Sequence, residues 1–172
     1  MCIRDRKKYI DMMKKNQLTR ALRIDKFTAA TLELVLQEYL SEEKAVQNIP
    51  VLRMITKSLD EVTKDAKKLC RILKAAKLSA EISVVPLESQ IGGGSLPLER
   101  IASMGVAINP EKISITELEE RLRHMPVPLI PRTANDTVLI DVRTMDEQNF
   151  KLLAKQLQEL QVFEEKSMIE VR

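Results

Sequence analysis

The spacing of apolar residues predicts helices in the first half of the chain. Five residues at spacings of three and four form one stripe: Leu32, Val35, Leu36, Tyr39 and Leu40. This stripe predicts a helix that begins after Asp25, a good N-cap, and ends near Leu40. Around it, residues 7–16 predict a short basic helix, residues 17–24 a connector and residues 41–50 a polar break.

A second helix is predicted more strongly, because it begins with a capping box. In the segment from Ser58 to Glu61, the hydroxyl and the carboxylate can each accept the other residue's free backbone N–H. An apolar stripe follows at helical spacing: Leu59, Val62, Ala66, Leu69, Leu73 and Ala76. The basic residues of this segment occupy the other faces: Lys64, Lys67, Lys68, Arg71 and Lys74.

The pattern changes to strands after residue 78. Three segments rich in β-branched or apolar residues predict strands: 81–85, which Pro86 should end, 103–108 and 137–142. Asn135-Asp136 predicts a hairpin turn between residues 129–130 and the last strand. Further capping boxes at 114–117 and 144–147 predict two more helices, the second with Phe150, Leu153, Leu157 and Leu160 on one face. Helices followed by mixed strands and helices predict an α+β domain, with about four mostly antiparallel strands and helices on one face.

Composition narrows the class of protein. The 172 residues are 44% hydrophobic and only 3% aromatic, so an aliphatic core is expected in one domain, with or without an appendage. No stretch free of Asp, Glu, Lys and Arg exceeds ten residues, whereas a membrane-spanning helix needs about 18, so we do not expect a membrane protein. Two isolated cysteines provide neither a disulfide framework nor a metal site. A cytoplasmic protein is the expectation.

Basic residues are concentrated at the start of the chain. Residues 1–26 contain nine Lys or Arg against three Asp, although the whole chain has a formal net charge of only +3. An anionic partner for this segment is one interpretation, and an ordinary solvated helix face is the other.

Few residues indicate a self-contained active site. His124 is the only histidine and has no partner in a triad or metal spacing. Gly92-Gly93-Gly94-Ser95 could contact a phosphate, but it lacks the Lys-Ser/Thr of a P-loop and could equally be a tight structural loop. Arg20 and Arg23 would share one side of a helix, a row that Lys26 would continue. Two guanidinium groups on one side of a helix can bind an oxyanion together. The alternative is that both arginines are simply exposed to solvent.

Five separated motifs resemble the bacterial selenocysteine synthases, the L-seryl-tRNA(Sec) selenium transferases. They occur in the order of that family: residues 20–28 (RALRIDKFT), 49–54 (IPVLRM), 89–97 (SQIGGGSLP), 125–132 (MPVPLIPR) and 139–144 (LIDVRT). The resemblance extends from about Lys7 to Leu160.

This resemblance implies a pyridoxal-phosphate (PLP) enzyme of the aminotransferase-like fold, fold type I. Residues 7–57 would be the end of its large domain and a connecting helix, and residues 58–172 its small C-terminal α+β domain. The family converts seryl-tRNA(Sec) to selenocysteinyl-tRNA(Sec) with selenophosphate as donor, and its Arg-Ala-Leu-Arg motif is the candidate to hold the donor anion. Carried over, this role falls to Arg20 and Arg23, with Gly92, Gly93, Gly94 and Ser95 as candidate loop contacts. The family assembles as a homo-oligomer.

The chain also departs from the family pattern. The Schiff-base lysine of the family lies before the position of Lys7, so no catalytic residue is assigned here. Residues 1–6 do not match, and we interpret them as a candidate artefact of cloning or sequence assembly. The hypothesis is therefore a C-terminal fragment that is inactive alone, with apolar surface exposed along residues 32–40 where the large domain would pack.

Two alternatives remain open. The first is a fragment of a related PLP enzyme that acts on a small amino acid or amino sugar. The second is a stand-alone RNA- or partner-binding module that uses the basic segment. A near absence of aromatic residues argues against single-stranded RNA recognition by such a module.

Overall fold

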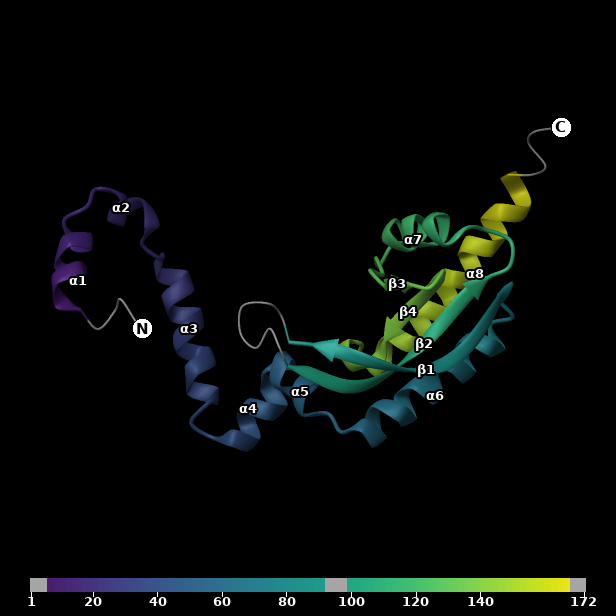
Figure 1. Ribbon diagram of the computed structural model, residues 1–172, viewed down its shortest axis with the longest axis horizontal. Coiled ribbons are helices and arrows are strands. Elements are labelled where there is room, and N and C mark those ends of the chain that lie inside the picture. The colour runs from purple at the N-terminus through teal and green to yellow at the C-terminus, as the bar shows by residue number, and fades with distance from the viewer. Residues whose placement is uncertain (1–5, 92–98, 168–172) are drawn as a thin grey trace. The chain divides into compact units, whose positions relative to one another are not determined.

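The computed structural model describes residues 6–91 and 99–167, with side chains described as far as Leu160. The chain divides into two compact units, residues 1–50 and residues 51–172 (Figure 1). The expected boundary after residue 57, between the domains of a whole PLP enzyme, stays a prediction.

The described part of the first unit consists of short helices joined by turns. Its helices are α1 (Lys7–Lys14), α2 (Leu18–Leu22), α3 (Lys26–Glu38) and α4 (Glu42–Asn48). Asp25 caps α3 as predicted, since its carboxylate accepts the Thr28 N–H at 2.8 Å.

Two segments of this unit were predicted wrongly. The expected connector at 17–24 contains α2, whose first turn is supported by Asn16: its side-chain oxygen accepts the Leu18 N–H at 2.9 Å. The expected polar break at 41–50 contains α4. Ser41 accepts the Lys44 N–H, and Glu42 and Glu43 in the first turn complement the helix dipole. Both helices are too short to produce an apolar repeat in the sequence.

The apolar stripe of α3 is exposed, as expected for residues 32–40. No residue of this helix is buried, and Leu36 is 56% exposed. Of residues 6–50 only Ala45 is buried. The first unit therefore has apolar side chains but no core of its own.

The second unit is an α+β domain, which confirms the predicted class. After α5 (Pro50–Thr56) its elements are α6 (Leu59–Ala75), β1 (Ala80–Gln90), β2 (Arg100–Pro110), α7 (Ile115–Arg123), β3 (Arg132–Ala134), β4 (Thr137–Asp141), the 3₁₀ turns η2 (Val142–Thr144) and η3 (Glu147–Asn149), and α8 (Phe150–Ser167). The four strands form one antiparallel sheet in the order β1-β2-β4-β3. Asn135 and Asp136 form the β3–β4 turn with φ near +50°, which matches the two positive φ angles of a type I′ hairpin.

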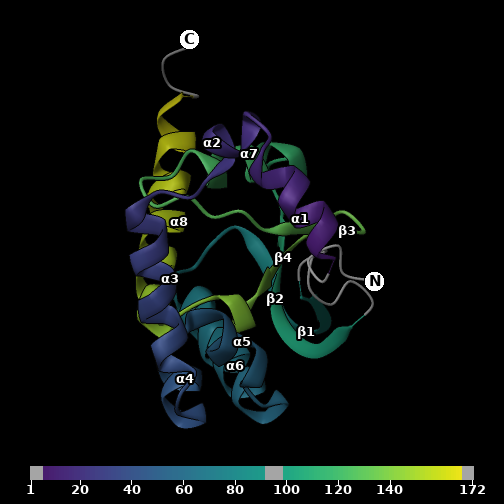
Figure 2. The same ribbon diagram turned by 90° about the vertical axis from the view of Figure 1, so that its left-hand side faces the viewer.

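Helices cover one face of this sheet. Figures 1 and 2 show α6 and α8 on the same side of the strands. Their buried residues, which include Leu69, Leu73, Phe150 and Leu157, form one core cluster with inward residues of all three longer strands. The predicted apolar stripes of the two helices therefore face the sheet, apart from Leu59 at the start of α6, which is exposed.

The first strand is longer than predicted. Pro86 does not end it: β1 continues to Gln90, and Pro86 lies opposite Met104. Because β1 is an edge strand with β2 as its one neighbour, proline can lie where its missing N–H would point away from the sheet.

The capping box predicted at 144–147 is also wrong. The Thr144 hydroxyl donates to the Asp141 carbonyl oxygen at 3.0 Å, and Glu147 forms an ion pair with Lys68. Two short 3₁₀ turns fill this segment, and α8 begins only at Phe150. The box at 58–61 is confirmed, because Ser58 and Glu61 cap each other. The box at 114–117 forms only in part: Ser114 accepts the Glu117 N–H, but the Glu117 carboxylate pairs with Arg121.

Candidate functional site

The two arginines predicted to bind an anion lie at the end of α2. Arg20 is in the helix, whereas Arg23 follows it with an extended backbone at ψ 140°. Lys26 begins the next helix, α3. The predicted row of Arg20, Arg23 and Lys26 is therefore not carried by one continuous helix. Both guanidinium groups are exposed to solvent.

The nearest acidic residue in the sequence does not neutralise these arginines. Asp25 accepts the backbone N–H of Thr28 at 2.8 Å and its hydroxyl at 3.1 Å. These hydrogen bonds, the backbone one first, lower the pKa of Asp25 below its ordinary value, so the carboxylate stays ionised as a helix cap. Within the described residues, Arg20 and Arg23 form no ion pair and remain available for an external anion.

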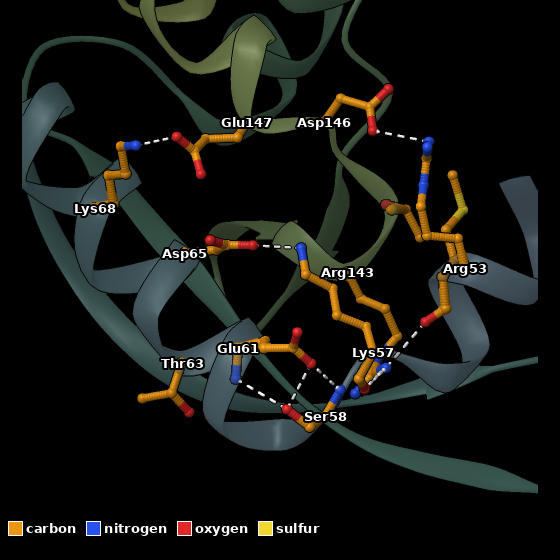
Figure 3. Close-up of polar contacts among 12 residues, drawn as sticks. Arg53, Lys57, Ser58, Glu61, Thr63, Asp65, Lys68, Arg143, Asp146 and Glu147 are labelled. Atoms are coloured by element: carbon orange, nitrogen blue, oxygen red, sulfur yellow. Dashed lines mark hydrogen bonds and ion pairs between the residues drawn. The ribbon is translucent and has the colours of Figure 1, made fainter. Parts of the chain in front are cut away.

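A different arginine is buried in the α+β domain. Arg143 is 4% exposed, and its side chain reaches the segment between α5 and α6 (Figure 3). One terminal nitrogen, Nη1, donates to the carbonyl oxygens of Met54 at 3.0 Å and Lys57 at 2.6 Å. The other, Nη2, donates to Ala102 in β2 at 2.8 Å. Nε of this arginine has no hydrogen-bond partner among the residues that the structure describes.

These contacts join the end of α5 to the sheet. A guanidinium group suits the C-terminal end of a helix, where carbonyl oxygens lack partners and the dipole favours a cation. Arg143 is therefore a positioning residue for the segment that leads into α6.

Three ion pairs surround this junction (Figure 3). Arg53 of α5 contacts Asp146 at 3.2 Å, Lys57 pairs with Asp65, and Lys68 pairs with Glu147. The hydrogen bond and the charge of Lys68 lower the pKa of Glu147. The Arg53 and Lys68 pairs are largely exposed, so each contributes less to stability than the buried arginine.

A cavity of the α+β domain lies beside the end of β4. It has a volume of about 560 Å³ and is bordered by the loop 127–132, the end of β1 and the first turns of α8. Asp141 lies at its edge and accepts hydrogen bonds from Ser89, from Ser103 at 2.8 Å and from the Arg143 N–H at 3.1 Å. Arg132 donates to the Glu88 carbonyl oxygen at 2.8 Å. Ser89, Arg132 and Asp141, which border this cavity, are therefore engaged in hydrogen bonds within the domain.

The residues described here do not fit a PLP site. A Schiff base needs a lysine amine inside a cavity, and no lysine lines the cavities of about 560 and 370 Å³. Lys112 borders a cavity of only about 50 Å³, which is too small for PLP. The most sheltered lysines of the described chain, Lys57 and Lys68, are held by carboxylates. The candidate loop contacts Gly92, Gly93, Gly94 and Ser95 lie outside the described residues.

Neither a metal site nor a membrane-spanning helix is found in the described part of the chain. Its residues contain no group of three or more His, Cys, Asp or Glu that could hold a metal ion. No helix among them is long and apolar enough to cross a membrane.

Sequence reasoning missed the roles of Arg132, Asp141 and Arg143. All three lie in motifs that carry the family resemblance, which was the one available signal. Their role depends on contacts between residues 38 to 89 positions apart, and spacing along the chain does not reveal such contacts.

Fold and site together define an α+β protein with a buried arginine at a helix junction and two anion-accessible arginines in a separate helical segment. A sequence model of the SelA family, described as L-seryl-tRNA selenium transferase, matches residues 2–146. The chain belongs to this family.

Curated relatives agree with the family match. A protein of Clostridium botulinum (strain Hall) named L-seryl-tRNA(Sec) selenium transferase is 45% identical over 155 residues, which cover 90% of this chain and 34% of the relative. Proteins of the same name from Clostridium perfringens (strain 13) and Alkaliphilus oremlandii are each 39% identical over 155 residues. The chain therefore spans about a third of the length of the curated relatives it matches.

Proposed function

We propose that this chain is the C-terminal part of an enzyme that converts seryl-tRNA(Sec) to selenocysteinyl-tRNA(Sec). The observation that carries the proposal is the family match over residues 2–146, together with 45% identity to a relative of that name. The complete enzyme would take selenium from selenophosphate, act as a homo-oligomer and work in the cytoplasm, where its tRNA substrate is found.

In this proposal the cofactor is PLP, bound by a part of the enzyme outside this sequence. PLP would supply electron withdrawal from the seryl group. Because the described residues form no PLP site, the chain alone should be inactive. Adding PLP to the purified chain should give no lysine-dependent change in the PLP absorbance spectrum. Such a change would contradict the proposal that PLP is bound by a part of the enzyme outside this sequence.

The substrate role assigned to this chain is to bind the selenium donor. Arg20 and Arg23 would hold the selenophosphate anion, since each guanidinium offers paired donors in a fixed plane. The support is their exposure, the engagement of Asp25 by Thr28, and the lack of an ion pair for either cation among the described residues.

The test uses the complete enzyme that contains this sequence. Selenium transfer from selenophosphate to seryl-tRNA(Sec) is measured for Arg20→Ala and Arg23→Ala, with Lys15→Ala as a control that removes an exposed cation of the same unit. Losing one charge-assisted contact should raise the KM for selenophosphate by about 10- to 100-fold, while Lys15→Ala leaves it unchanged. An equal effect of all three substitutions would contradict an anion site at the two arginines. No transfer by the unmodified enzyme would contradict the proposed function itself.

A further inference from the structure

Helix α6 carries a row of cations on the side opposite the core. Lys64, Lys67, Arg71 and Lys74 follow at spacings of three and four, and all four are exposed. Lys77 continues the row just beyond the helix, with φ at 53°. We call these five residues the α6 basic stripe. The apolar side of the same helix, with Val62, Ala66, Leu69 and Leu73, is fully buried in the core.

Ion pairs do not neutralise the stripe, although the Glu61 carboxylate attracts Lys64 across one turn of the helix. Eight of the other described cations of residues 51–172 form ion pairs, among them Arg53, Lys68 and Arg100, whereas no member of the stripe forms one with the described residues. From residue 66 to residue 77 the sequence contains no acidic residue. Like charges three and four apart repel each other along a helix, so the arrangement costs stability in the isolated chain.

The helix dipole explains only part of this row. A cation is favoured near a helix C-terminus, but the effect falls off within the last turn. It accounts for Lys74 and Lys77. Lys64, Lys67 and Arg71 lie further from that end, and the dipole does not account for them.

The shape of the stripe favours an extended anion. Lys64 and Lys74 lie about 15 Å apart along the helix axis, at 1.5 Å per residue. A single small anion would need cations that converge in a cavity, and the cavities of about 560, 370 and 50 Å³ in this domain are lined by other residues. A nucleic-acid backbone, with regularly spaced phosphates, matches a straight row of cations.

Two further features of α6 narrow the class of ligand. The first favours RNA over an anionic membrane, and the second favours an RNA duplex over a single strand. A helix that lies on a membrane inserts its apolar face, and that face of α6 is occupied by the core. No aromatic residue lies in α6, so the stripe offers no platform on which unpaired bases could stack.

We propose that the α6 basic stripe binds the phosphate backbone of a double-helical RNA arm. This inference rests on the proposed function, in which the substrate is a tRNA, and adds to it a contact surface on the α+β domain. The contact would be independent of base sequence, because lysine and arginine would reach phosphates rather than base edges.

The test compares two charge-matched variants of the 172-residue chain. Lys67→Gln with Arg71→Gln removes two cations of the stripe, and Lys112→Gln with Lys151→Gln removes two exposed cations elsewhere on the same domain. Fluorescence anisotropy measures binding to a tRNA(Sec) transcript and to an unrelated 12-base-pair RNA duplex between 0.05 and 0.4 M KCl. Circular dichroism checks that both variants are folded.

Counter-ion release sets the expected size of the effect. Each lost phosphate contact lowers the slope of log affinity against log salt by about 0.9, so the stripe variant should lose about 1.8 in slope and bind about 60-fold more weakly at 0.1 M salt. The control variant should bind both RNAs as the unmodified chain does.

Three outcomes would overturn the inference: equal losses in the two variants, no RNA binding by the unmodified chain, or a stripe-dependent binding to vesicles containing phosphatidylserine without any to RNA. None of these would alter selenium transfer by the complete enzyme, so failure of the stripe and failure of the proposed function are distinguishable.

Discussion

The two units of the chain use their apolar residues in opposite ways. In residues 51–172 the large apolar residues of α6 and α8 are buried against one sheet, and Leu73 is fully buried. In residues 6–50 the comparable stripe of α3 is exposed, with Leu36 at 56%. One unit therefore contains the partners that its helices need, and the other does not.

This difference indicates which part of the chain can fold independently. A helix of 13 residues is marginally stable in water unless its apolar face is packed. The exposed stripe of α3 is thus typical of a segment whose packing partner belongs to a larger protein, which agrees with a chain that spans 34% of its relative.

The largest expected effect comes from cutting the chain between Pro50 and Val51. The piece 51–172 should unfold cooperatively in urea, because it retains the whole core cluster. The piece 1–50 should show no cooperative transition by circular dichroism. A cooperative transition in the short piece, or none in the long one, would reverse the comparison.

Matched leucine substitutions test the same contrast within the intact chain. Leu73→Ala should lower the free energy of unfolding by about 2–5 kcal/mol, since it opens a cavity in the core. Leu36→Ala removes the same atoms from an exposed site and should change it by less than about 0.5 kcal/mol. Urea denaturation measures both values, and similar losses would mean that α3 is packed in solution.

Capping residues made much of this architecture predictable. Asp25 and Ser58 mark the starts of α3 and α6 in the sequence, and the apolar stripes of α6 and α8 identify most of their buried residues. The hairpin at Asn135-Asp136 was also predictable, because few residue pairs adopt two positive φ angles.

The errors arose where local rules depend on tertiary context. Pro86 ends a central strand but not an edge strand, and the sequence does not state the strand order. Thr144 and Glu147 have the spacing of a capping box, yet Glu147 is drawn to Lys68, 79 residues away. For the candidate site, the arginine pair 20 and 23 was visible as a motif, whereas the Arg143 junction required knowledge of which carbonyl oxygens lie nearby.

Arg143 holds the end of α5, which follows the boundary between the two units, so removing its guanidinium group should destabilise residues 51–172. Arg143→Met keeps much of the side-chain volume but leaves the carbonyl oxygens of Met54, Lys57 and Ala102 without a donor. The free energy of unfolding of 51–172 should fall by about 2–3 kcal/mol. Arg53→Met, which removes an exposed ion pair, should cost less than about 1 kcal/mol. Equal losses of unfolding free energy in the two variants would show that the buried Arg143 contributes no more to stability than the exposed Arg53 ion pair.

The smallest effect compares the helix caps of the two units. Ser58→Ala should lower the free energy of unfolding by about 1 kcal/mol at pH 7, because α6 is packed in the core. Asp25→Ala should reduce the helix signal near 222 nm in circular dichroism. It should leave the unfolding transition of 51–172 unchanged, because no residue of α3 is buried in a core.

The pH dependence of the Ser58 cap follows from Glu61. The side-chain hydrogen bond from Ser58, followed by its backbone N–H, lowers the pKa of Glu61 below the ordinary value of 4.5. A lowered carboxyl pKa stabilises the fold above the ordinary value, and this stabilisation is lost as the pH falls through the lowered pKa. Ser58→Ala removes the hydroxyl and with it part of the lowering of the Glu61 pKa. The difference in unfolding free energy between the unmodified chain and Ser58→Ala should therefore be constant from pH 7 to about 5. Below pH 4.5 this difference should become smaller. Urea denaturation at pH 7, 5, 4 and 3 measures the difference, and a gap that stays constant to pH 3 would mean that Glu61 does not contribute to the cap.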